Sequence, residues 1–154
     1  MSITIRSANL DTPEFAALID THAELMLSLS PPGSCHFLPM AGLRIPEVTV
    51  WEMRDGEDLV GCGALQELSP THGEVKSMHM LSRKRGSGLG RRMLEHILSA
   101  ARARGYTRLS LETGSMDGFK PSRTLYKSCG FEICPPFGDY VEDPNSVFMT
   151  LNLG

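Results

Sequence analysis

The sequence of 154 residues predicts an α+β fold with a mixed sheet, and two observations support this class. In the first half, short segments that alternate apolar and polar residues follow one another with turn residues between them, which is typical of antiparallel strands. In the second half, two segments with apolar residues at helical spacing lie between strands. We therefore expect a single domain over residues 1–154, with six or seven strands and about four helices.

The N-terminal half is expected to form a strand, two helices and an antiparallel series of strands. Asp11 or Thr12 is suited to cap the first helix, because Pro13 follows and apolar residues then recur every three or four positions. The SPPGS segment at residues 30–34 must end that helix, and Asp55-Gly56 forms the turn of a hairpin. Thr71-His72-Gly73 is expected to form the turn before the next strand. The expected elements are a strand at residues 3–6, helices at 13–29 and near 38–44, and strands at 48–53, 58–68 and 73–81.

The C-terminal half is expected to alternate helices and strands. Leu89, Met93, Ile97 and Ala101 share one face of a helix, and Gly105 is suited to end that helix as a C-terminal cap. The expected elements are helices at residues 89–104 and 121–129, and strands at 108–112, 131–134 and 146–153.

Composition restricts the class of protein. The chain carries a formal net charge of −3, with 41% hydrophobic and 21% charged residues, which is ordinary for a globular protein. Its apolar runs are too short to cross a bilayer and residues 1–10 lack the features of a signal peptide, so we expect a cytoplasmic protein with no membrane partner. Mild acidity argues against a nucleic-acid partner. Four cysteines without a CxxC pair predict reduced thiols, of which Cys129 and Cys134 are expected to be buried. Five histidines without paired ligand spacing predict no metal.

A basic, glycine-rich segment between a strand and a helix indicates an anion site. Residues 82–94, SRKRGSGLGRRML, hold five cations around Gly86, Gly88 and Gly90. Glycines let the backbone approach a ligand closely, and the first N–H groups of a helix carry a partial positive charge that favours phosphate. The spacing fits neither a P-loop, which needs GxxxxGK[ST], nor a dinucleotide-binding GxGxxG turn. An ordinary glycine-rich turn stays open as the alternative.

Two motifs together resemble a known family. Arg85-x-x-Gly88-x-Gly90, after a strand and before a helix, resembles the R/Q-x-x-G-x-G/A signature of the GNAT N-acetyltransferases. LYKSCGF at residues 125–131 resembles the later LY-x-x-x-GF signature of that superfamily, at a similar separation. The segments HGEVKSM, LETGSM, PSRTLY and FGDYVEDPNSVFM further resemble a bacterial subgroup of acetyltransferases whose acceptors are largely undefined.

The resemblance implies the GNAT fold and acetyl-CoA as cosubstrate. The two parallel central strands, near residues 73–81 and 108–112, are then expected to splay and admit the coenzyme. The main chain of Met80 and Leu81 would pair with the pantetheine arm like an added strand. The residues expected to hold the coenzyme pyrophosphate are Arg85, Gly86, Ser87, Gly88, Leu89, Gly90 and Arg91.

Acetyl transfer to an amine requires a proton acceptor and a partner for the departing thiolate. The resemblance points to Glu74 as the base, although a solvent-facing carboxylate at a strand end is the alternative. His79 is a second candidate, but strict alternation would place it on the opposite face unless a bulge intervenes. Tyr126 corresponds to the tyrosine credited with assisting the thiolate, most simply by a hydrogen bond, and packing of the helix is its alternative role.

The acceptor is less defined than the coenzyme. His36 and Phe37, between the first two helices, and Tyr140 are the residues expected to contact substrate. We expect the primary amine of a small molecule, attacking directly in a ternary complex, and a homodimer stays open. Two rival functions remain: an acyl-CoA-binding or regulatory domain without catalysis, and a nucleotide-binding module that uses the same loop for ATP.

Overall fold

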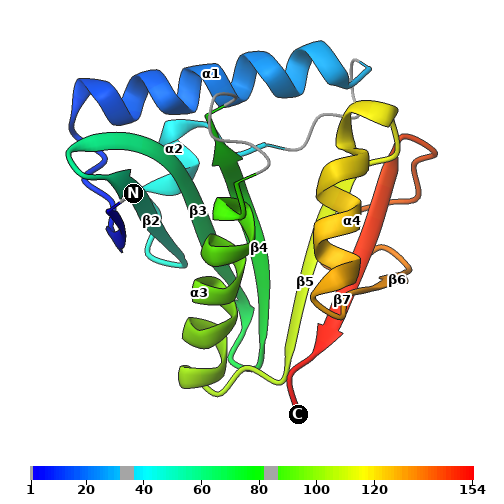
Figure 1. The fold of residues 1–154 in the computed structure, drawn as a ribbon. Coiled ribbons are helices and arrows are strands. Elements are labelled where there is room, and N and C mark those ends of the chain that lie inside the picture. Colours follow the sequence, from blue (N-terminus) through cyan, green and yellow to red (C-terminus); the bar gives the residue numbers. More distant parts are fainter. Residues whose placement is uncertain (1, 32–36, 82–86) are drawn as a thin grey trace.

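The computed structural model describes residues 2–31, 37–81 and 87–154, which form a seven-stranded mixed sheet flanked by helices (Figure 1). The strand order is β1-β2-β3-β4-β5-β7-β6. The strands are β1 (Ile3–Ser7), β2 (Val48–Asp55), β3 (Asp58–Ser69), β4 (His72–Met80), β5 (Arg108–Gly114), β6 (Glu132–Cys134) and β7 (Ser146–Asn152). The helices are α1 (Pro13–Leu29), α2 (Met40–Leu43), α3 (Leu89–Ala103), α4 (Lys120–Ser128) and the 3₁₀ helix η2 (Asp117–Phe119). The predicted α+β mixed sheet is confirmed.

The centre of the sheet opens between β4 and β5. These two strands are the parallel neighbours in the sheet, and they pair at His72–Arg108, Gly73–Leu109 and Glu74–Ser110. Beyond these pairs the strands diverge, and α1 crosses above the open end (Figure 1). The predicted splaying of the two central strands is therefore present, and the candidate functional site lies in this opening.

Helix α1 begins and packs as its sequence pattern predicts. Thr12 is the N-cap residue, and its hydroxyl accepts a hydrogen bond from the Phe15 backbone N–H at 3.2 Å. Phe15, Leu18 and Ile19 recur at helical spacing and are buried in a hydrophobic cluster with β2 and β3 residues. The same face places His22 toward the sheet interior, where it is buried.

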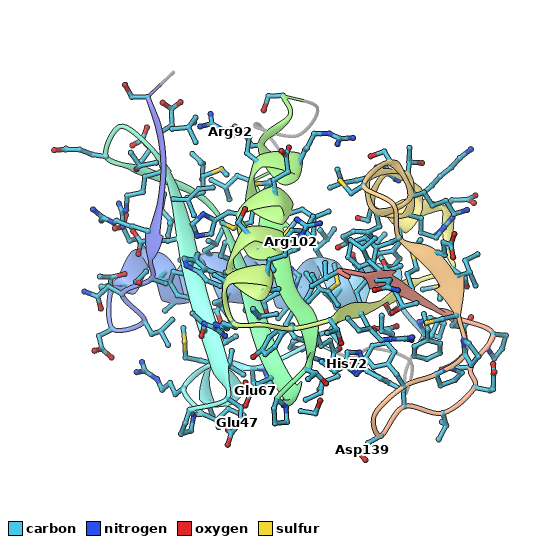
Figure 2. The ribbon with its side chains drawn as sticks, turned by 90° about the horizontal axis from the view of Figure 1, so that it is seen from below. Glu47, Glu67, His72, Arg92, Arg102 and Asp139 are labelled. Carbon is cyan, nitrogen blue, oxygen red and sulfur yellow. The ribbon has the colours of Figure 1, made fainter. Side chains whose placement is uncertain are left out.

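Helix α3 packs on the sheet through one apolar face. Gly63 of β3 permits this close approach, because a Cβ at that position would lie 2.8 Å from Met93 Cγ. Gly105 follows the helix with a φ of +82°, the left-handed conformation expected of a C-terminal glycine. Arg92 and Arg102 lie along α3 (Figure 2). The buried residues of α3 are Leu89, Met93, Leu94, Ile97, Leu98 and Ala101.

Three local features differ from the sequence prediction. The 3₁₀ helix η2 was not expected. His72 begins β4 instead of occupying a turn, and its Nε2 lies 2.7 Å from Ser110 Oγ near the closed end of the sheet (Figure 2). Cys129 and Cys134 are partly exposed, whereas buried thiols were expected. Among the described residues, no helix has the length and apolar character needed to cross a membrane.

Candidate active site

A groove of about 580 Å³ extends from the opening of the sheet to the start of α3. The C-terminal half of α1, the end of β4 and one side of α4 form its walls. Its apolar lining residues include Leu25, Met26, Leu29, Met78, Phe119 and Leu125. Of the residues expected to bind coenzyme, Met80, Gly88, Gly90 and Arg91 line this groove. Its volume and apolar walls suit an organic ligand.

The start of α3 supplies the polar end of this groove. Gly88 is the N-cap residue with a φ of +83°, which a glycine adopts without steric cost. The side chain of Leu89 is buried in the core, so only its backbone can face a ligand. Arg91 reaches from α3 to the end of α4, where its guanidinium donates hydrogen bonds to the Ser128 hydroxyl and to Cys129 Sγ. An N-terminal helix turn with an arginine beside it is a site for an anionic group.

The predicted coenzyme residues in the preceding loop are only partly described. Ser87 precedes the N-cap residue Gly88, whereas Arg85 and Gly86 lie outside the described residues. At the end of β4, the Leu81 N–H donates to the Val60 carbonyl of β3 at 2.9 Å. Main-chain groups of successive strand residues point to opposite edges, so the main chain of Met80 is the one that faces the opening.

A second, smaller cavity of about 100 Å³ adjoins the groove. The two cavities share the lining residues Met26, Met78, Phe119, Ser122 and Tyr126. The other side of the small cavity is polar, with Glu74, Lys76, Glu112, Tyr140 and His22. Phe37, expected to contact substrate, also lines it, whereas His36 lies outside the described residues. The two cavities thus place a charged compartment next to an apolar groove.

Glu74 is buried and held by two neighbours. Its side chain is 5% exposed, which excludes the alternative of a solvent-facing carboxylate. The Tyr140 hydroxyl donates to Glu74 Oε2 at 2.6 Å, and Lys76 Nζ lies 3.0 Å from the same oxygen. Lys76 Nζ also donates to the Tyr140 hydroxyl at 2.7 Å. Tyr140 lies 66 residues from Glu74 in the sequence, so the fold creates this triad.

Glu112 is a titratable residue of the cavity that the sequence analysis did not single out. It lies on β5, two residues beyond the last pair with β4. Burial raises the pKa of its carboxyl to about 7, and the charges of Glu74 and Asp143 act in the same direction. The Lys76 charge and the nearby Ser146 hydroxyl oppose this shift. The signal available in the sequence was a carboxylate in a strand whose apolar residues, Leu109 and Leu111, alternate with polar ones.

A bulge in β4 brings His79 to the same face as Glu74. Ala64 pairs with Lys76 and Cys62 with His79, so β4 has one more residue than β3 over this stretch. Ser77 in this stretch has a φ of +53°. His79 is buried, and its Nδ1 lies 3.1 Å from His22 Nδ1 on α1. His22 lines the small cavity and His79 the groove.

Tyr126 lies where the two cavities meet. Its ring packs edge-on against Phe131, with the ring centroids 5.9 Å apart, and the side chain is buried. Burial and the charge of Glu112 raise the pKa of its hydroxyl to about 12. Tyr126 therefore anchors α4 and also lines both cavities, so its packing role and its place in the site coexist.

The described residues contain no group of three or more His, Cys, Asp and Glu side chains arranged to hold a metal. Cys62 lies opposite His79 in the sheet and donates to the Ser77 carbonyl at 3.1 Å. Burial raises the pKa of its thiol to about 12. Cys62 therefore stays protonated near neutral pH and is unsuited to act as a nucleophile.

The arrangement fits acetyl-CoA: an apolar groove with a basic helix start at one end and a compartment of proton-transfer groups at the other. Comparisons with known proteins agree with this interpretation of the site. Residues 18–131 match the model of the acetyltransferase (GNAT) family. An uncharacterized N-acetyltransferase of Bacillus subtilis, YsnE, is 48% identical over 149 residues, which cover 97% of this chain and 99% of that protein. The chain belongs to the GNAT family, and its predicted class, an acetyl-CoA-dependent N-acetyltransferase, is confirmed.

Solved structures show the same fold. A protein of Klebsiella pneumoniae, provisionally named an acyl-CoA N-acyltransferase, has a TM-score of 0.80 and 29% identity, with 99% of this chain and 98% of that chain covered. A GNAT family acetyltransferase from Elizabethkingia anophelis, solved with acetyl-CoA bound, has a TM-score of 0.70 and 18% identity, with 98% of each chain covered.

Proposed function

We propose that this enzyme transfers the acetyl group of acetyl-CoA to the primary amine of a small molecule by direct attack in a ternary complex. One observation carries the proposal: the apolar groove and the charged cavity meet at Tyr126. A thioester in the groove and an amine in the cavity would thus approach each other at one point, which is the positioning that direct transfer requires.

The groove is assigned to the coenzyme. The backbone N–H groups at the start of α3 and the Arg91 guanidinium would hold its phosphates, with Arg85, Gly86 and Ser87 completing the loop. The main chain of Met80 would bind the pantetheine arm. Acetyl-CoA, when bound, supplies the thioester carbonyl that the amine attacks.

The small cavity is assigned to the acceptor. Its volume of about 100 Å³ accommodates a small group better than a folded surface. Its polar wall combines the Glu74–Lys76 ion pair with Glu112, which suits a cationic amine that must lose a proton. Direct attack is supported by the environment of Cys62, whose protonated, hydrogen-bonded thiol is unsuited to carry an acetyl group.

Calorimetric titration with acetyl-CoA tests the coenzyme assignment. We expect micromolar binding to the native protein and loss of binding in Gly88→Glu, because the new carboxylate would repel phosphate at the start of α3. Gly88→Ala is the matched control: a Cβ there meets no atom within 4 Å, so this variant should retain most of the affinity despite its strained φ. Equal affinity in the native protein and Gly88→Glu would contradict the assignment.

A panel of primary amines then tests the acceptor assignment. Amino acids, amino sugars, polyamines, short peptides and a lysine-containing protein are offered with acetyl-CoA, and thiol release is followed. Acetylation of small amines is expected. Acetylation of the protein alone would overturn the small-molecule proposal, and tight coenzyme binding without any transfer would favour the non-catalytic alternative.

A further inference from the structure

We propose that Glu112 is the group that takes the proton from the acceptor amine, while Glu74 serves as a positioning residue in its ion pair with Lys76. This inference rests on the proposed acetyl transfer and assigns the base within the same cavity. It departs from the sequence-based expectation, in which Glu74 is the base.

The position of Glu112 follows from the register of the two central strands. Glu74 pairs with Ser110, so Glu112 is the next residue of β5 on the same face, just where the strands diverge. It therefore lines the acceptor cavity from β5, the strand next to the one that carries Lys76. Its charge also acts on Tyr126 and Tyr140, raising the pKa of both hydroxyls. Glu112 thus lies within electrostatic reach of the point where the two cavities meet.

Glu74 is less suited to accept a proton. Its Oε2 atom already accepts a hydrogen bond from the Tyr140 hydroxyl and contacts the Lys76 ammonium. Because both contacts occupy this oxygen, it is not open to an incoming amine. The triad instead has a fixed geometry that can orient an acceptor beside Glu112.

The groups facing Glu112 come from four elements. Lys76 and Glu74 lie on β4, Tyr126 lies on α4, and Asp143 and Ser146 lie before and at the start of β7. Tyr140 faces it from the preceding loop. Because burial dominates, the pKa of Glu112 is close to neutrality, and that is the range in which a general base works best near pH 7.

The proton balance is as follows. Glu112 takes the proton that the ammonium form of the acceptor must lose before its nitrogen lone pair can attack. The C–N bond then forms and the C–S bond breaks, and the second nitrogen proton neutralises the thiolate, which the Tyr126 hydroxyl stabilises by a hydrogen bond. Glu112 returns its proton to solvent. The products are the amide and the free thiol of coenzyme A.

Titration of the protein without ligands tests the assignment independently of activity. Glutamate side chains are labelled with ¹³C at the carboxyl, and carboxyl resonances are followed from pH 4 to pH 9. We expect one resonance with a midpoint near pH 7 that is missing in Glu112→Gln and present in Glu95→Gln, an exposed control on α3. If no such resonance depends on Glu112, the proposal is overturned.

Kinetics with the amine that the native enzyme acetylates fastest in the panel give the second readout. We expect Glu112→Gln to lower kcat at least about 100-fold, with KM for acetyl-CoA within a few-fold of native, and to abolish the acidic limb of the pH–rate profile near pH 7. Glu74→Gln should retain the acidic limb of the pH–rate profile. The limb should move to lower pH, because a negative charge that raises the pKa of Glu112 is removed.

The outcomes separate this inference from the proposed function. If the native enzyme acetylates amines and Glu112→Gln acetylates them equally well, the role of Glu112 is overturned and acetyl transfer stands. If Glu74→Gln loses the limb while Glu112→Gln keeps it, Glu74 is the base. If the native enzyme binds acetyl-CoA but acetylates nothing in the panel, both the proposed function and the role of Glu112 fall together.

Discussion

Lys76 Nζ lies 3.0 Å from Glu74 Oε2, and both largely buried side chains line the small cavity. The ion pair compensates two charges that would each be costly in isolation. Lys76 also acts on Glu112, where its positive charge opposes the rise in pKa caused by burial. The ammonium of Lys76 thus links the two carboxylates of the cavity.

Removal of this charge is predicted to shift the pH dependence of catalysis. In Lys76→Met, the positive charge that opposes the rise in the pKa of Glu112 is lost, so deprotonation of Glu112 needs a higher pH. We expect the acidic limb of the pH–rate profile to move above the native position near pH 7, with activity partly recovered at pH 9. An unchanged acidic limb would contradict an influence of Lys76 on the pKa of Glu112.

Glu112 is predicted to cost stability as pH rises. Its pKa of about 7 in the folded protein exceeds the ordinary value of 4.5, so the folded state favours the protonated form. Below pH 4.5 the carboxyl of Glu112 is protonated in both the folded and the unfolded protein. Between pH 4.5 and about 7 it ionises in the unfolded protein first, so the free energy of unfolding falls as pH rises. Glu112→Gln should therefore have a free energy of unfolding up to about 3 kcal/mol higher than the native protein above pH 7. Below pH 4.5 the two proteins should have similar stability. Urea unfolding between pH 4 and pH 8.5 measures this difference; a constant difference at all pH values would contradict it.

Tyr126 is predicted to assist the thiolate by a hydrogen bond without transferring its proton. With a pKa of about 12 against about 8.5 for a thiol, full transfer is uphill by roughly 5 kcal/mol. Tyr126→Phe should lower kcat about 10-fold, and the native enzyme should show no alkaline limb assignable to Tyr126 below pH 10. Tyr106→Phe is the matched control, because Tyr106 is equally buried and its hydroxyl donates to Glu67 away from both cavities. An alkaline limb lost only in Tyr126→Phe would indicate general acid catalysis.

The contact between His22 and His79 is predicted to hold α1 against β4. Their Nδ1 atoms lie 3.1 Å apart and both side chains are buried, so His22→Ala should leave a buried polar atom of His79 with one partner fewer. We expect a loss of about 1–3 kcal/mol in the free energy of unfolding. Thr21→Ala, at an exposed position of the same helix, should change stability by much less. Equal losses of unfolding free energy in His22→Ala and Thr21→Ala would mean that the contact between His22 and His79 contributes nothing measurable to stability.

Local sequence patterns predicted most of the fold. The apolar spacing of α1 and α3, the N-cap at Thr12 and the glycine after α3 are determined by residues within one or two turns of each other. The loop glycine Gly88 could also be assigned from its motif, because its positive φ serves a local helix start. Such features need no information from distant parts of the chain.

The face on which His79 lies could not be derived from alternation, because a single extra residue in β4 reverses the pattern. The same limit applies to Glu112. Nothing near it in the sequence raises its pKa; the shift arises from burial and from charges on β4 and before β7. Likewise, Tyr140 reaches Glu74 only because the fold brings a distant loop to the open edge of β4.

The sequence by itself determined the family and the order of helices and strands, and it indicated the loop that we propose to bind the coenzyme. Periodicity, capping and short motifs are properties of neighbouring residues. Only the tertiary structure decided which carboxylates share the small cavity and which of them has a pKa raised to near neutrality. The physical reason is that desolvation and Coulomb interactions depend on distance in space, and here they join residues from β4, β5, α4 and the segment before β7.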